Sequence, residues 1–193
     1  TEPLEEREEA RVIREKDDIN QSKLVIGCNI EDMSSFDLNF SLTLYTLILG
    51  GTPDSKFFKN IREKYSLCYY ITASSLKLNH AMLFKAGIDS KNFDETLEHI
   101  RHEMKEMELG HFTDTDIESA KQTYLTMLKS ITDSQKSMAY SVLLMKSLDL
   151  GTIEERRENI LKVTKEQIME VAKKIKINTI YLLEEASHEE SGV

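Results

Sequence analysis

The spacing of apolar residues changes along this chain, and the order of those changes constrains the fold. In LVIGCNI (24–30) every second residue is apolar, which is the pattern of a half-buried strand, and INTIYLL (177–183) has the composition of another strand. Between them, apolar residues recur mostly at every third or fourth position, as in amphipathic helices. Strands at both ends with helices between predict an α+β fold, in which an antiparallel or mixed sheet packs against several helices.

The same patterns place the other elements. A further strand is expected over 11–16, and two strands, CYYITAS and NHAMLFKAGI, are expected to form a hairpin around 76–79. A helix from Ser35 is expected to end at Gly50-Gly51, because glycine pairs commonly close helices. A short helix follows, with Phe57, Phe58, Ile61 and Tyr65 facing inward. Later helices are predicted over 93–107, 113–131, 134–148, 152–161 and 164–175.

Composition limits the classes of protein to consider. The 193 residues are enough for one well-filled core, and we expect a charged lead-in over 1–20 that can form an edge strand, a single domain over 21–185, and a mobile acidic tail over 186–193. The charged start suggests a piece of a longer protein. A net charge of -9 argues against nucleic acid as a partner, and no apolar run approaches the length of a membrane span.

Five histidines are the candidate ligands for a catalytic zinc: His80, His99, His102, His111 and His188. Zinc sites on helices use motifs such as His-x-x-Glu-His or His-Glu-x-x-His, and neither occurs here. The nearest match is HIRHE (99–103), with the last two letters exchanged. That exchange moves the ligand and the base by about 100° around a helix. We therefore expect a solvated, charged helix face, with a metal site as the weaker alternative.

Nucleophilic catalysis finds no support in the sequence. Cys28 and Cys68 lie in separate apolar strands without Cys-x-x-Cys spacing, which predicts buried free thiols and a cytoplasmic location. No Gly-x-Ser-x-Gly motif occurs. Gly50-Gly51 follows a helix and lacks the Lys-Ser/Thr of a phosphate loop. The segment that stands out is GGTPDSKFFKNIREKYSLCYY (50–70).

This segment resembles a stretch in the C-terminal halves of the insulinase/pitrilysin family of zinc peptidases, which includes the mitochondrial processing peptidases. The family pattern is Gly-Gly, a small loop, Ser-x-Leu/Phe-Phe, then Arg-Glu-Lys and Leu-x-Tyr. The chain matches it at Gly50, Gly51, Ser55, Phe57, Phe58, Arg62, Glu63, Lys64, Leu67 and Tyr69. Weaker resemblance extends to DINQSKLVIG (18–27) and FTDTDIESAKQTYL (112–125).

The resemblance implies a fold and a site. Members of the family have two homologous α+β halves that close like a clamshell around an extended peptide, and the N-terminal half carries His-x-x-Glu-His. The C-terminal half carries an arginine and, seven residues later, a tyrosine that reach the substrate near the scissile bond; these map onto Arg62 and Tyr69. Gly50, Gly51, Ser55 and Phe58 would support them. A guanidinium can hold peptide carbonyls, and a phenol can stabilise an oxyanion.

The resemblance also implies partners. The chain would need the missing N-terminal half, or a metal-bearing paralogous subunit, to supply zinc, and would be inactive alone. The chain departs from the family pattern in KYSLCYY (64–70), where Tyr65 and Cys68 replace residues that are commonly small or basic. This stretch is similar to that of a Gram-positive bacterial branch of the family. In that branch the genes come in adjacent pairs, and one member of each pair has lost the metal motif. Two hypotheses stay open: the chain is the substrate-binding half of a peptidase, or it comes from a non-catalytic scaffold subunit. A third hypothesis is a helix-rich interaction domain in which the motif occurs by chance.

Overall fold

The computed structural model describes residues 9–131, 143 and 145–186. Most of the helix expected over 134–148, and all but the first residue of the tail expected over 186–193, lie outside these described residues. Whether 21–185 forms the domain unit stays a prediction.

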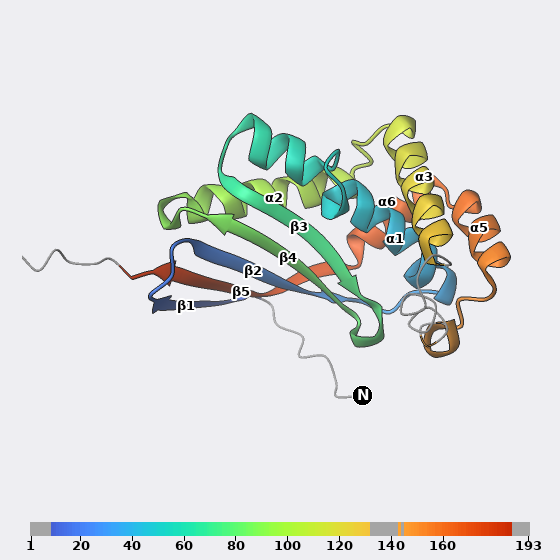
Figure 1. Ribbon diagram of the computed structural model, residues 1–193, viewed down its shortest axis with the longest axis horizontal. Helices are drawn as coiled ribbons and strands as arrows, with labels where there is room; N and C mark the ends of the chain where they lie inside the picture. Colours follow the sequence, from blue (N-terminus) through green and yellow to red (C-terminus); the bar gives the residue numbers. More distant parts are fainter. Residues whose placement is uncertain (1–8, 132–142, 144, 187–193) are drawn as a thin grey trace, which may run out of the picture.

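Five strands form one mixed sheet in the order β1-β5-β2-β4-β3 (Figure 1). Strand β1 runs parallel to β5, and the other neighbouring strands pair antiparallel. The mixed sheet predicted from the sequence is therefore confirmed, and β1 and β3 are its two edges in the described part of the chain. The strands are β1 Arg11–Asp17, β2 Ser22–Ile30, β3 Cys68–Leu76, β4 Ala81–Ile88 and β5 Ile175–Glu185.

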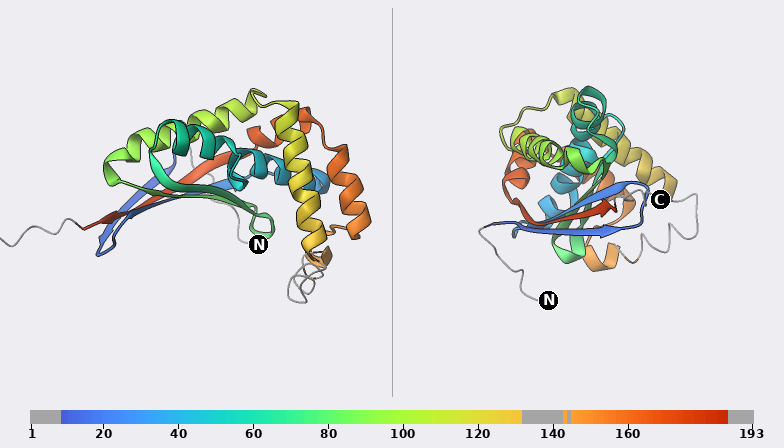
Figure 2. Two further views of the ribbon diagram at one scale, coloured as in Figure 1. Left: turned by 45° about the horizontal axis from the view of Figure 1, so that its top comes forward. Right: turned by 90° about the vertical axis from the view of Figure 1, so that its left-hand side faces the viewer.

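The helices cover one face of this sheet, and α3 and α5 stand at one end of it (Figure 2). The first helical stretch consists of η1, α1 and η2, which follow one another without a break. The segments η1, η2 and η3 are π-helical, with wider turns than an α-helix. The helical elements are η1 Asp37–Ser41, α1 Leu42–Thr46, η2 Leu47–Gly51, η3 Phe57–Lys64, η4 Lys77–Asn79, η5 Ser90–Asn92, α2 Phe93–Glu108, α3 Asp114–Ser130, α5 Ile153–Lys162 and α6 Lys165–Lys173.

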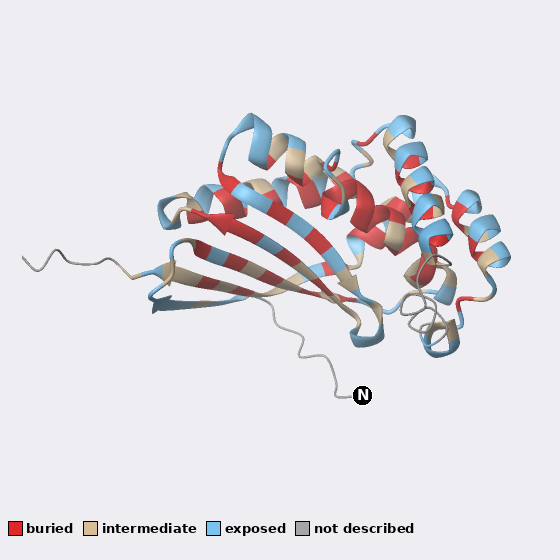
Figure 3. Ribbon diagram, viewed as in Figure 1, coloured by how far each residue is buried: buried red, intermediate tan, exposed pale blue. Residues whose placement is uncertain are grey.

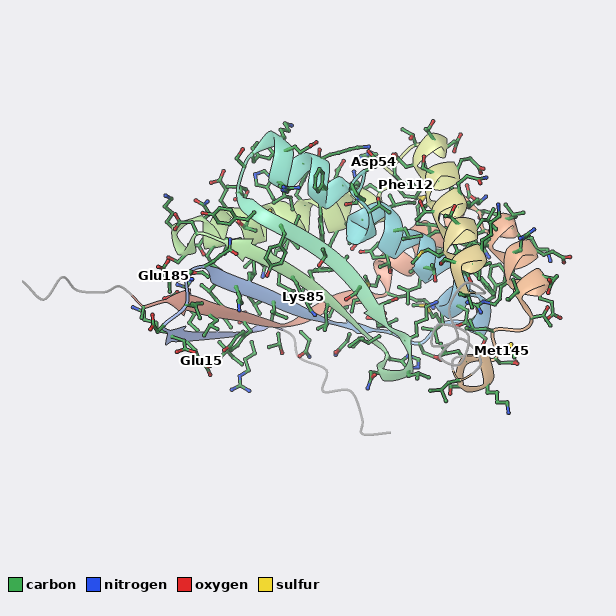
Figure 4. The ribbon with its side chains drawn as sticks, in the orientation of Figure 1. Glu15, Asp54, Lys85, Phe112, Met145 and Glu185 are labelled. Carbon is green, nitrogen blue, oxygen red and sulfur yellow. The ribbon has the colours of Figure 1, made fainter. Side chains whose placement is uncertain are left out.

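The core lies between the sheet and these helices. Every second residue of β2 and of β4 is buried on the helix side, and Figure 3 shows the resulting stripes. Lys85 of β4 alternates with buried Phe84 and Ala86 and is exposed, so its side chain lies on the open face of the sheet (Figure 4). The alternation predicted for 24–30 is confirmed: Leu24, Ile26, Cys28 and Ile30 are all buried.

Local sequence signals fix several helix ends. Capping boxes start α3 at Thr113, α5 at Thr152 and α6 at Thr164, which are the starts that the sequence predicts for these helices. Gly110 follows α2 with a φ of 76°, which glycine adopts without strain. No helix in the described ranges is long and apolar enough to span a membrane.

The structure corrects the sequence prediction at two helix ends. Tyr65 was expected to face inward but is 43% exposed and stacks on His99, with ring centroids 4.1 Å apart. It lies beyond the end of η3, just before Ser66 turns the chain with a φ of 54°, so the helical period no longer sets its direction. The helix expected to reach Ile175 ends at Lys173, and Ile175 begins β5.

Candidate functional site

The glycine pair brings the end of η2 against β3. A methyl group built on Gly50 would lie 2.7 Å from Phe57 Cδ2, 2.8 Å from Ala73 Cβ and 2.9 Å from Ala73 N. Neither Gly50 nor Gly51 has a positive φ. The helix does end at Gly51, as predicted, but the pair does not form the left-handed cap that such glycines usually provide. Its role at Gly50 is close approach to the strand.

A groove of about 450 Å³ follows the edge of β3 beside this contact. Five consecutive strand residues, 70–74, line it, so both the inward-facing and the outward-facing positions of β3 contribute. The groove therefore runs along the open edge of the strand, where backbone N–H and C=O groups can pair with another extended chain. The remaining lining residues are Gly50, Gly51, Thr52, Pro53, Phe58 and Arg62.

Arg62 lies on η3 and lines this groove. Its guanidinium carbon is 4.6 Å from the centre of the Phe58 ring, one helical turn earlier, and this cation–π contact limits how the side chain can move. Arg62 is nevertheless exposed, so its N–H groups can reach a bound peptide.

A hydrogen bond joins the segment before η3 to the loop between α2 and α3. Ser55 is 2% exposed, and its backbone carbonyl accepts a hydrogen bond from Lys59 N in the first turn of η3. Lys56 Nζ donates to the His111 carbonyl at 3.1 Å, which joins the loop carrying Asp54 to the loop carrying Phe112 (Figure 4). These contacts hold η3, and with it Arg62, in a fixed place.

Tyr69 sits at an irregularity in β3. Cys68 pairs with Ile88 and Tyr70 with Gly87, so Tyr69 is an extra residue without a partner on β4. A regular strand would put Tyr69 and Tyr70 on opposite faces, but the bulge breaks this alternation and leaves both tyrosines exposed, Tyr69 by 64% and Tyr70 by 42%. Bulges commonly re-aim a side chain in this way.

The two predicted working residues lie near the same end of β3, in different surroundings. Arg62 lines the groove together with Tyr70, whereas Tyr69 is not among the groove's lining residues. The pKa of Lys91 is raised, mainly by Asp89 and to a smaller extent by Tyr69, so the Tyr69 phenol lies toward Lys91. The arrangement offers an edge strand, a guanidinium beside it and an exposed phenol next to it.

The HIRHE residues engage separate partners. Glu103 is 4% exposed; its Oε1 accepts a hydrogen bond from Asn60 Nδ2 at 2.8 Å, and its Oε2 lies 3.1 Å from Lys56 Nζ. The expected solvated face is therefore wrong at Glu103, since that position faces η3 and is buried. His99 stacks on Tyr65 instead. Among the described residues, which exclude His188, no group of three or more His, Cys, Asp or Glu could hold a metal ion.

Both cysteines are free and buried, as the sequence predicts. Burial raises the pKa of the Cys68 thiol to about 11, although the nearby Arg62 guanidinium acts in the opposite direction. Burial also raises the pKa of the Cys28 thiol far above its usual value. Both sulfurs are thus protonated at neutral pH and are poor nucleophiles.

Comparison with known proteins decides the family. The sequence profile described as the peptidase M16 inactive domain matches residues 1–124, which is more than half of the chain. The chain belongs to this family. The insulinase/pitrilysin resemblance and the expected half-domain fold are thereby confirmed. A curated relative, the probable inactive metalloprotease YmfF of Bacillus subtilis (strain 168), is 27% identical over 181 residues, covering 93% of this chain and 42% of the relative.

Solved structures agree on the fold. A conserved protein from Enterococcus faecalis V583 matches with a TM-score of 0.88 and 29% identity, over 95% of this M16 chain and 44% of that one. A protease from Helicobacter pylori matches with a TM-score of 0.74 and 16% identity, over 91% and 44%. The chain thus spans less than half the length of these relatives, where this domain is joined to a further part of the protein. The Bacillus and Enterococcus relatives also agree with the Gram-positive resemblance.

Sequence reasoning missed Tyr70, Thr72 and Ser74 as groove residues. The strand they belong to was recognised, but its position at the sheet edge follows from the strand order, in which β4 takes β2 as its second neighbour and β3 has no second neighbour in the described residues. The only sequence signal for these residues is that they alternate with Ile71 and Ala73, which are buried. Such alternation predicts a half-buried strand, but it does not tell whether the strand lies at the edge or in the middle of a sheet.

Proposed function

We propose that this M16 domain is the substrate-holding half of a zinc-dependent peptidase, whose metal site is on another half or subunit. The observation that carries the proposal is the groove along the β3 edge with Arg62 beside it. An extended peptide would pair with the β3 backbone with little sequence preference, and the Arg62 guanidinium would hold its carbonyls. The exposed Tyr69 phenol would donate to the oxyanion as zinc-bound hydroxide attacks.

Removing the Arg62 charge should weaken peptide binding. In the intact protein, with metal removed by EDTA so that nothing is cut, Arg62→Gln is expected to raise the Kd of a fluorescein-labelled ten-residue unstructured peptide about tenfold. A hydrogen bond to a charged group contributes about 1.5–3 kcal/mol, and solvent exposure places Arg62 at the low end. Fluorescence anisotropy measures the effect.

The matched control is Arg101→Gln, which removes the same charge from an exposed position on α2 outside the groove. It should leave the Kd within twofold of wild type. If both variants bind the peptide as tightly as the wild type, the groove does not hold substrate through Arg62.

A second candidate is a non-catalytic subunit that binds or scaffolds an active partner. It is favoured by the Bacillus relative, which is named a probable inactive metalloprotease. The scaffold reading predicts that the intact protein alone binds no zinc and that peptide hydrolysis appears only when a metal-bearing paralogue is added. Mass-spectrometric metal analysis tests it, and one zinc per intact protein would count against it. A cytoplasmic location is also proposed, on the two free, buried thiols alone.

A further inference from the structure

A second, larger hollow lies at the far end of β3, between the tip of the β3–β4 hairpin and helices α3 and α5. The left view of Figure 2 shows the hairpin tip near the end of α3. The hollow has a volume of about 670 Å³ and is called the Lys77 cavity here. Its walls include Thr43, Leu47, Lys77, Leu128, Leu150 and Arg156. It is thus an apolar space that contains two cationic side chains.

The ammonium of Lys77 is held inside this cavity by neutral groups. Lys77 Nζ donates to the Asn39 carbonyl at 2.8 Å and to Thr43 Oγ1 at 2.7 Å, both on the first helical stretch. In the described part of the chain no carboxylate lies within ion-pair distance of Lys77. An ammonium has three donors, so beside these two partners in the described residues one N–H of Lys77 is left for a ligand.

A second cationic side chain lines the same cavity. Arg156 is 7% exposed and lines the same cavity, where its Nε donates to the Tyr124 hydroxyl at 3.4 Å. Burial, and secondarily the Arg156 guanidinium, lower the pKa of Lys77 to about 7. Burial disfavours the charged form of Lys77, and a bound carboxylate would stabilise that form.

The Lys77 cavity continues the β3 groove. Gly51, Ala73 and Ser74 line both hollows, so the two meet about halfway along the strand. An extended chain advances about 3.3 Å per residue, and a peptide beginning opposite Tyr70 would therefore reach Lys77 after about seven residues. The apolar walls near Lys77 would then surround the residue that arrives there.

We propose that the Lys77 cavity binds the carboxylate of a peptide residue, from the C-terminus or from an acidic side chain, at the far end of a peptide lying along β3. This assignment rests on the proposed function for the position of the peptide, and it adds a preference for acidic or C-terminal segments. The Lys77 ammonium binds the carboxylate, Arg156 lies beside it, and Leu47, Leu128 and Leu150 contact the apolar part of the same segment.

Small probes test the cavity without requiring a whole peptide. We expect N-acetyl-leucine to bind the intact protein at least tenfold more tightly than N-acetyl-leucine amide, measured by ligand-observed NMR titration at pH 6. N-acetyl-glutamate α-amide, compared with N-acetyl-glutamine amide, tests the side-chain source in the same way. Discrimination only in the first pair assigns the cavity to a C-terminus, and discrimination only in the second assigns it to an acidic side chain. Equal binding of acid and amide in both pairs overturns the proposal.

Lys77→Met should abolish the preference for the acid, and it should fold because it removes a charge from a partly buried position. The matched control is Lys105→Met, which removes an exposed lysine on α2 that pairs with Glu108. Binding of the acid by wild type should weaken about tenfold or more from pH 6 to pH 8.5, since Lys77 loses its proton around pH 7. Arg156 and Tyr124 are the other ionisable residues that line the described part of the cavity. A Lys77→Met protein that still prefers the acid would overturn the assignment.

Arg62→Gln separates this proposal from the proposed function. Arg62 lines the groove but not the Lys77 cavity, so N-acetyl-leucine should bind that variant as it binds the wild type. If the acid binds at Lys77 while the ten-residue peptide binds without any contribution from Arg62, the proposed function fails and the carboxylate site stands. If the peptide depends on Arg62 and neither acid shows any preference over its amide, the carboxylate site fails and the proposed function stands.

Discussion

Replacing Tyr69 with phenylalanine is expected to lower kcat for peptide hydrolysis about 100-fold in the intact protein assembled with its metal-bearing half. The substitution removes one hydroxyl and keeps the ring. Because the proposed hydrogen bond forms only as the oxyanion develops, kcat should fall while KM changes little. Tyr69 is 64% exposed, so the fold should tolerate the change. Steady-state kinetics with an internally quenched peptide measures both constants.

The neighbouring Tyr70 provides a matched control. It is exposed on the same strand, and its ring fills the space that a side chain at Gly87 would need, 2.5 Å from that position. Tyr70→Phe keeps this ring packing and should change kcat less than threefold. Turnover by Tyr69→Phe within twofold of wild type, or an equal loss in both variants, would remove Tyr69 from the proposed mechanism.

Much of the fold is readable from the sequence because its signals are local. Capping boxes at Thr113, Thr152 and Thr164 depend on side chains three residues apart, and all three are present in the structure. The alternation from Leu24 to Ile30 likewise reflects one buried face of a central strand. Each of these patterns lies within one helix or strand, so it can be recognised without knowing how distant segments of the chain pack.

The site is less readable because its geometry depends on distant segments. The bulge at Tyr69 exists only relative to the register with β4, and a strict period-2 reading puts Tyr69 and Tyr70 on opposite faces. Lys77 is an unremarkable turn lysine in sequence, and only the packing of the first helical stretch, α3 and α5 encloses it in a cavity. Arg62 and Tyr69 were found through the family pattern, and their catalytic roles stay a prediction.

Gly50→Ala should destabilise the fold by about 3 kcal/mol, the upper part of the range for overpacking a filled core. The added methyl group would meet the Phe57 ring on one side, and the Cβ and backbone nitrogen of Ala73 on the other, all within 2.9 Å. A backbone nitrogen cannot move aside as the end of a flexible side chain can. The clash must therefore push η2 away from β3, which also distorts the groove that Gly50 lines. Urea unfolding of the intact protein, followed by far-UV circular dichroism, measures the loss.

Gly27→Ala is the control, because a methyl group there would have its nearest neighbour, the Thr179 carbonyl oxygen, at an ordinary 3.8 Å. Its unfolding free energy should equal that of wild type or exceed it by up to about 1 kcal/mol. Neither position needs a positive φ, and alanine lowers the conformational entropy of the unfolded chain equally at both positions. The difference between the two variants then isolates the close approach at β3. Equal stability would mean that the contact relaxes at little cost. A large loss only at Gly50, accompanied by weaker peptide binding, would show that the glycine pair serves the site by letting a helix end lie against the edge strand.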